Sequence, residues 1–157
     1  MRLLKIVLYV LVILVLQTVV FARLNFFGVR PDLVLVLAIV WAVLFSRRNA
    51  TLLTLITALM QDILSFGIYL NIITKVVVGT LVSTMKEGFI GDDFHLAVWC
   101  VALFTPLSLI AEGIILFFFA HKQVDVPHLL FMMIFATIYN FILLYPIFFI
   151  VKKIGHD

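Results

Sequence analysis

The chain has 157 residues, of which 66% are hydrophobic and only 12% are charged. Soluble domains are roughly half apolar and a quarter charged, so a water-soluble fold of this length could not hide so much apolar surface. The net charge of +3 is carried by single or paired basic residues between apolar runs, which indicates orientation in a membrane rather than nucleic-acid binding. The one cysteine, Cys100, excludes an intrachain disulfide and a cysteine-based zinc site.

Six apolar runs predict an all-α integral membrane protein, built as one domain over residues 1–157 from a bundle of six transmembrane helices. The runs cover residues 3–22, 32–45, 50–64, 68–85, 95–120 and 127–151. Because about 20 apolar residues cross a bilayer, the short second and third runs are expected to be tilted, re-entrant or extended past their polar flanks. The first run lacks a small-x-small cleavage site before Arg23, so we expect it to remain as a membrane anchor.

Basic residues favour one side of the predicted bundle. Six spans place both termini on the same side, together with Arg2, Lys5, Arg47, Arg48, Lys86, Lys152 and Lys153. The opposite side holds Arg23, Arg30 and Lys122. Cytoplasmic loops are enriched in Lys and Arg, so this imbalance predicts cytoplasmic termini. Trp41 and Trp99 fall near the predicted cytoplasmic ends of their runs, where we expect both indoles in the headgroup region.

Charged residues within the apolar runs predict a buried polar cluster. Asp62, Lys75 and Glu112 lie inside runs, where an unpaired charge costs about 3 kcal/mol or more, and Asp32 lies at a border. At 1.5 Å per residue, Lys75 and Glu112 lie at similar depths, about 10 and 12 Å from the outer ends of their runs. We therefore expect Lys75 to pair with Glu112, Asp62 or both in the outward half of the bundle, with Asn71 in the same cluster.

Two interpretations of this cluster stay open. It is either a set of contacts that holds helices together or the lining of a polar cavity for a solute or a proton. Gly79 and Ser83, four residues apart in the fourth run, similarly predict either close packing within the chain or a seam between two copies.

No catalytic motif is evident, and the prediction is a protein that is not an enzyme. His-Glu-x-x-His, Gly-x-Ser-x-Gly and the phosphate-binding Gly-Lys-Ser/Thr pattern are all missing from the sequence. Asp32 and Asp62 raise a distant alternative, an intramembrane aspartyl protease, because such chemistry needs two carboxylates close together. The four histidines lie at run borders or at the terminus, and we expect neither a metal nor a cofactor.

Short motifs follow one another in a characteristic order along the chain. They are Pro31-Asp32-Leu33, the basic pair Arg47-Arg48, the turn containing Asp62, Ser65 and Gly67, then Gly79, and a last run from Tyr139 to Pro146 that closes on Lys152-Lys153. Together with the length and the number of runs, this series resembles the rod shape-determining protein MreD family over essentially the whole chain. The chain departs from that family before Asp62, where Thr54, Thr57 and Ala58 replace the usual glycines.

The resemblance implies a non-enzymatic scaffold in the inner membrane of a bacterium. Such a subunit belongs to the cell-elongation machinery, contacts MreC and, through it, MreB and the lateral-wall synthases that make peptidoglycan. The hydrophobic pattern is also similar to that of the substrate-binding subunits of energy-coupling-factor transporters, which implies the same six-helix fold. Their function is the rival hypothesis, in which a small vitamin-like solute binds near Asn71, Lys75 and Glu112.

Overall fold

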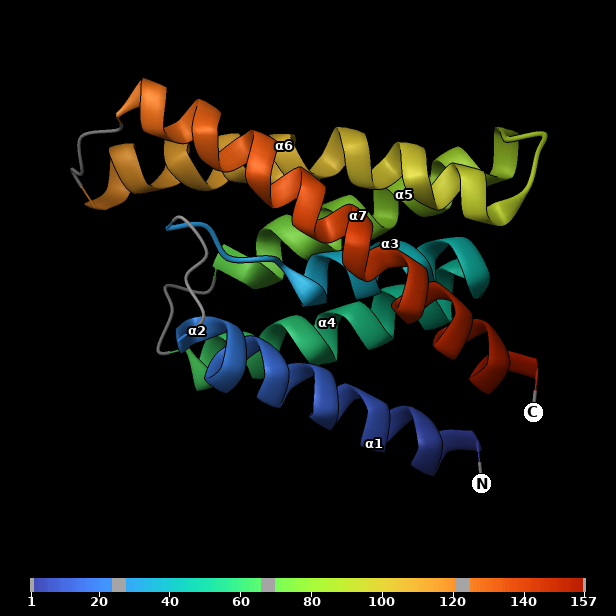
Figure 1. Ribbon diagram of the computed structural model, residues 1–157. Coiled ribbons are helices and arrows are strands. Elements are labelled where there is room, and N and C mark those ends of the chain that lie inside the picture. Colours follow the sequence, from blue (N-terminus) through green and yellow to red (C-terminus); the bar gives the residue numbers. More distant parts are fainter. Residues whose placement is uncertain (1, 24–27, 66–69, 121–124, 157) are drawn as a thin grey trace.

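The computed structural model describes residues 2–23, 28–65, 70–120 and 125–156, and within them the chain is all-helical (Figure 1). This confirms the predicted all-α class. The first helical rod is α1 (Arg2–Val15), which continues through the π-helical turn η1 (Leu16–Val20) into α2 (Phe21–Arg23). Five more follow: α3 (Leu33–Leu44), α4 (Arg47–Leu64), α5 (Leu70–Gly88), α6 (Asp93–Ala120) and α7 (Val126–His156). Gly67 and Lys122, which carried part of the sequence argument, lie outside the described residues.

Helix α3 is the core of the bundle. It contacts α1, α4, α5, α6 and α7, and these five surround it in that order, with α7 closing against α1. Eleven of its 12 residues, from Leu33 to Val43, are buried. Only a helix that is apolar on every face can occupy such a position, and α3 contains no polar side chain apart from the indole N–H of Trp41. The prediction of an interfacial Trp41 is therefore wrong, because this side chain is 2% exposed, whereas Trp99 is 69% exposed.

Helix α3 also begins inside the bundle rather than at one of its ends. An α-helix of 12 residues rises about 18 Å, compared with about 30 Å for the hydrocarbon core of a bilayer. Residues 28–32 lead to this start and run from a positive-φ glycine, Gly28, into the middle of the bundle (Figure 1). Pro31 lacks a backbone N–H and disfavours a helical conformation at Arg30, so the chain stays extended until Asp32.

Both termini lie at one end of the bundle, with the α3–α4 and α5–α6 turns (Figure 1). We call this the terminal end. Basic side chains of the described residues gather there near the helix ends, namely Lys5, Arg47, Arg48, Lys86, Lys152 and Lys153. Arg23, at the end of α2, and Arg30 belong to the opposite end.

Polarity in the bundle is inverted relative to a water-soluble protein. The outer face of α4 exposes only large apolar side chains over three turns, namely Leu52, Leu55, Ile56, Leu59, Met60, Ile63 and Leu64. The buried polar side chains are Thr54, Thr57, Gln61, Asp62, Thr74, Lys75, Ser83, Thr105, Ser108 and Asn140. By length and composition, two helices can cross a membrane, through Asp93–Ile115 of α6 and Val126–Gly155 of α7.

Gly79 and Ser83 face the inside of the bundle, where α5 packs against α4. Both residues are buried, and a Cβ atom added at Gly79 would lie 3.5 Å from Oγ1 of Thr54. That distance is an ordinary van der Waals contact, so the space admits a methyl group and nothing larger. This small-residue step therefore packs helices of the same chain together.

Gly79→Ala should fold normally, whereas Gly79→Leu should lower the free energy of unfolding by about 2 kcal/mol because the longer side chain forces α4 and α5 apart. The measurement is the thermal unfolding of the purified protein in detergent. Gly88→Leu is the matched control, since nothing lies within 4 Å of a Cβ atom at this residue of the same helix. Equal losses in the two leucine variants would contradict the close packing at Gly79.

Candidate functional site

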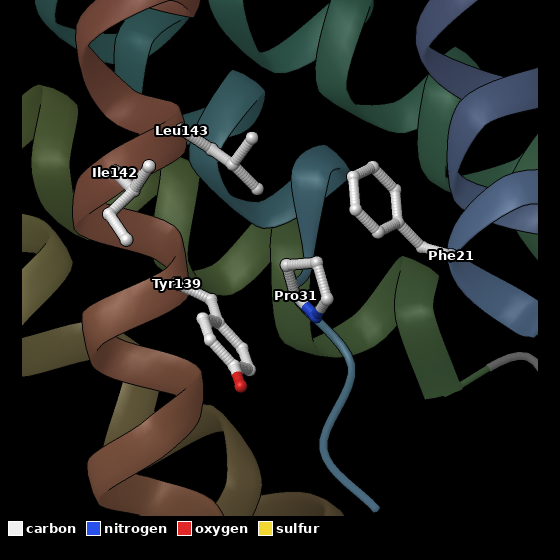
Figure 2. Close-up of a pocket in the computed structure, with 5 residues that line it drawn as sticks. All are labelled: Phe21, Pro31, Tyr139, Ile142 and Leu143. Carbon is white, nitrogen blue, oxygen red and sulfur yellow. The ribbon is translucent and has the colours of Figure 1, made fainter. Parts of the chain in front are cut away.

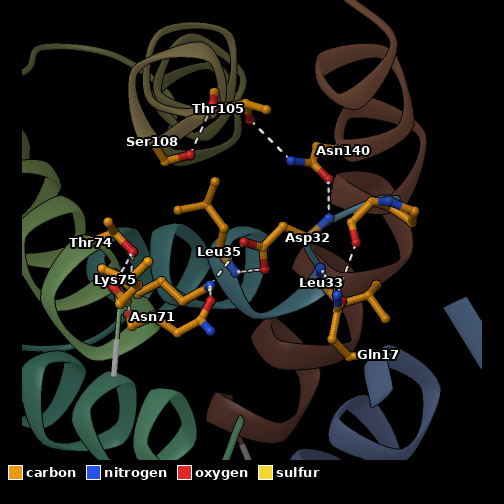
Figure 3. Close-up of polar contacts among 12 residues, drawn as sticks. Gln17, Asp32, Leu33, Leu35, Asn71, Thr74, Lys75, Thr105, Ser108 and Asn140 are labelled. Atoms are coloured by element: carbon orange, nitrogen blue, oxygen red, sulfur yellow. Dashed lines mark hydrogen bonds and ion pairs between the residues drawn. The ribbon is translucent and has the colours of Figure 1, made fainter. Parts of the chain in front are cut away.

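The buried start of α3 leaves backbone N–H groups that need hydrogen-bond acceptors. Asp32 is the N-cap, and its Oδ1 accepts a hydrogen bond of 3.0 Å from the N–H of Leu35. Gln17 Oε1, on η1, accepts from the N–H of Leu33 at 2.8 Å. Asn140 Oδ1, on α7, accepts from the N–H of Asp32 itself at 2.9 Å (Figure 3). Side chains from two other helical rods thus complete the first turn of α3.

The amide groups of Gln17 and Asn140 also donate, which fixes how each side chain is oriented. Gln17 Nε2 donates to the carbonyl of Pro31 at 3.1 Å. One side chain therefore binds backbone groups on both sides of Asp32, the carbonyl of Pro31 and the N–H of Leu33. Asn140 Nδ2 donates to Oγ1 of Thr105 on α6 at 3.1 Å. Asn140 and Thr105 are 0% and 2% exposed, so bulk solvent reaches neither partner. Asn140 therefore joins α3, α6 and α7 at one point.

Lys75 supplies the positive charge of the site. Its Nζ lies 2.9 Å from Oδ2 of Asp32, and it also donates a hydrogen bond to Oδ1 of Asn71 on the preceding turn of α5 (Figure 3). The Lys75 side chain is 1% exposed and that of Asp32 is 26% exposed. A buried ammonium group is tolerated only when it is paired and hydrogen-bonded, and both conditions hold here.

Asp62 accepts hydrogen bonds from backbone N–H groups at the start of α5, as Asp32 does at the start of α3. Its Oδ2 accepts from the N–H of Ile72 at 3.0 Å, and its Oδ1 accepts from Nδ2 of Asn71 at 2.7 Å and from the Asn71 N–H at 3.3 Å. These N–H groups belong to the first turn of α5, where the helix dipole stabilises a negative charge. A carboxylate on α4 thus caps the next helix, and Asn71 links it to Lys75.

The predicted direct partner of Lys75 needs correction. The ion pair is with Asp32, not with Glu112 or Asp62, because the late start of α3 carries Asp32 inward to the depth of Lys75. Asp62 reaches Lys75 only through Asn71. Glu112, on α6, is half-buried and close enough to Lys75, Asp32 and Asp62 to interact with their charges, but it makes no hydrogen bond or ion pair within the described residues.

Sequence reasoning did not place Gln17 and Asn140 in the cluster. Each is a single amide within a long apolar run, and nothing in the local pattern says which backbone group it meets. A signal for Asp32 was available, because an Asp directly before an apolar run marks a helix N-cap. The run that follows is short for a transmembrane helix, which fits a helix that begins inside the bundle as well as one that is tilted, re-entrant or extended past its flanks.

The polar side chains of this network pair with one another, and none of them lines either of two hollows among the described residues. A groove of about 230 Å³ is lined by Phe21, Pro31, Tyr139, Ile142 and Leu143 (Figure 2). A second hollow, of about 210 Å³, lies between α6 and α7 and is lined by Ile110, Gly113, Ile114, Phe117, Phe118 and Leu129. The one link is Pro31, whose ring lines the first groove and whose carbonyl accepts a hydrogen bond from Gln17. Among the described residues, His, Cys, Asp and Glu form no group of three or more that could hold a metal ion. No family model, curated protein or solved structure matches this chain.

Replacing Lys75 with Met should lower the free energy of unfolding by about 3–5 kcal/mol, because the Asp32 carboxylate loses its counter-charge inside the bundle. Adding Asp32→Asn should restore much of that loss, since Asn still caps a helix and carries no charge. The measurement is denaturant unfolding of the purified variants in mixed micelles.

The two other carboxylates provide matched controls for the rescue. Lys75→Met combined with Glu112→Gln or with Asp62→Asn should stay as unstable as Lys75→Met alone or become less stable. Rescue by Glu112→Gln but not by Asp32→Asn would assign the pair to Glu112 and would contradict the geometry described here.

Proposed function

We propose that the chain is an integral membrane protein whose six helices lie in the inner membrane of a bacterium with both termini in the cytoplasm. The inverted polarity supports this location, because a lipid environment satisfies the exposed apolar faces of α4, α6 and α7. Lys or Arg residues lie at the terminal end in the first turns of α1 and α4, in the last turn of α5 and near the end of α7, and such basic residues favour the cytoplasmic side.

Within that membrane, its function is that of a non-enzymatic scaffold in the cell-elongation machinery, as in the MreD family. Its direct partner is MreC, and through MreC it couples MreB to the lateral-wall synthases. The observation that carries this proposal is that the family-like motif residues make the contacts on which the fold depends. Pro31 and Asp32 start α3, Asp62 caps α5, and Gly79 allows α5 to approach α4.

The polar network favours a scaffold over a solute-binding subunit. A vitamin-like solute would need a cavity beside Asn71, Lys75 and Glu112, yet Asn71 and Lys75 are committed to Asp62, Asp32 and each other. The protease alternative fits less well still, because the two aspartates hold different helix N-termini rather than sharing one proton. A rigid body with an apolar outer surface is suited to binding the transmembrane helices of partners.

Depleting the protein from the rod-shaped bacterium that encodes it should convert rods into rounded cells within a few generations, and MreC should co-purify with it from detergent extracts. The measurements are the length-to-width ratio of the cells and quantitative mass spectrometry of the purified complex. Re-expression of the wild-type chain should restore rods, as should the well-folded Gly88→Leu variant, whereas the misassembled Lys75→Met variant should not.

Two results would overturn the scaffold function. Depleted cells that keep their rod shape and build normal walls would show that elongation does not need this protein. A small vitamin-like solute bound in stoichiometric amount to the purified protein would instead support the transporter subunit.

A further inference from the structure

Two hydroxyl groups in the described helices differ from all the others. Most serine and threonine hydroxyls donate to a carbonyl three or four residues earlier in their own helix, namely those of Thr18, Thr51, Thr57, Thr74, Thr80, Thr84, Ser108 and Thr137. Thr105 accepts a hydrogen bond from Asn140. The hydroxyls of Thr54 and Ser83 have no hydrogen-bond partner among the described residues. They are therefore available to bind something else.

Both unpaired hydroxyls lie where α4 packs against α5. Thr54 is 1% exposed and Ser83 is 4% exposed, so bulk solvent reaches neither. Oγ1 of Thr54 is directed at α5, because it lies 3.5 Å from the position of a Cβ atom at Gly79. The two helices run antiparallel (Figure 1), so Ala50, four residues before Thr54, is level with Ser83, four residues after Gly79. Each hydroxyl thus faces a residue with a small side chain or none.

The spacing of the two hydroxyls suits one small molecule between them. Residues four apart on a helix face have Cβ atoms about 5–6 Å apart, so Ser83 lies one turn from the point on α5 that Thr54 approaches. Two oxygens about 6 Å apart are too far from each other for a direct hydrogen bond, but each can bond to an atom halfway between them. Gly79 leaves space for a group the size of a methyl and no larger.

Water fits this position better than a cation or an apolar molecule does. It has the right size, and like a hydroxyl it both donates and accepts hydrogen bonds. A calcium or magnesium ion would need about six oxygen ligands, whereas two side-chain oxygens meet here. An apolar molecule would leave both hydroxyls unpaired. The other unpaired buried oxygen, Oε1 of Gln61, lies seven residues or about 10 Å along α4 from Thr54 and belongs to a different position.

We propose that one water molecule is bound between α4 and α5, where it bridges Oγ1 of Thr54 and Oγ of Ser83. The inference goes beyond the scaffold function and does not depend on it. Asp62 already joins the two helices near their outward ends through its hydrogen bonds to Asn71 and Ile72. The bridging water joins them again in the half of the bundle near the terminal end, and it provides a polar contact where side chains alone do not meet.

A double-mutant cycle with Thr54→Val and Ser83→Ala tests the bridge. Each substitution removes one partner of the same water, so each should raise the equilibrium constant of unfolding about fivefold. The double variant should also raise it about fivefold, rather than the roughly 25-fold expected of two independent sites. The measurement is denaturant unfolding of the purified protein in mixed micelles, with helix content as the check that each variant is folded.

Thr57→Val is the matched control. Thr57 is also 1% exposed and lies on the same helix, but its hydroxyl donates to the carbonyl of Leu53. Its effect should therefore multiply with that of Ser83→Ala. A nuclear Overhauser effect between water and the α protons of Gly79 should be seen in the wild-type protein and in Thr57→Val, and should be lost in Thr54→Val.

Three results would overturn the proposal. Multiplying effects of Thr54→Val and Ser83→Ala would mean that the two hydroxyls share no ligand. A lower equilibrium constant of unfolding in either single variant would mean that the hydroxyl it removes is buried without any partner. A wild-type protein without the water signal at Gly79, or a Thr54→Val variant that keeps it, would exclude water at this position.

Discussion

A helix that begins inside a closed bundle must find partners for backbone groups that water would otherwise satisfy, and this requirement shapes the protein. Helix α3 is buried on every side, so its first N–H groups are available only to side chains of the surrounding helices. Leaving one such group unpaired would cost about 1–3 kcal/mol. The amides of Gln17 and Asn140 and the carboxylate of Asp32 meet that need. The segment that leads to α3 stays extended because Pro31 prevents an earlier start.

The charges in the bundle follow from this arrangement. Asp32 caps α3 with one oxygen and holds Lys75 with the other, so the ammonium group is placed by the start of α3. Asn71 accepts a hydrogen bond from Lys75 and donates one to Asp62, the α4 residue that caps α5. Asn140 donates a hydrogen bond to Thr105 on α6. Side chains or backbone groups from all six helical rods therefore belong to one hydrogen-bonded system. Such a system specifies one packing of helices whose apolar surfaces alone would fit together in several ways.

Much of the helical framework could be predicted from the sequence, but its internal pairing could not. The helices lie where the apolar runs lie, although α4 begins at Arg47 rather than at residue 50 and α5 continues to Gly88 rather than ending at residue 85. The polar residues Asp62, Asn71 and Lys75 could be recognised because they interrupt apolar runs. The partner of Lys75 depends on how far inside the bundle α3 starts, and this is set by how the five surrounding helices pack around α3. The surrounding helices also bury Trp41, which its position in the apolar run had placed at the membrane–water interface.

The central claim is that side chains from other helices complete the first turn of α3. Amide hydrogen exchange of the protein in micelles, followed residue by residue by NMR, measures this directly at the N–H groups of Asp32, Leu33 and Leu35. The account predicts that these amides exchange as slowly as those in the middle of α3, and that Asn140→Leu speeds exchange at Asp32 by at least about tenfold. Exchange in the wild-type protein as fast as at a frayed helix end would show that the start of α3 is open to water, and would contradict the account.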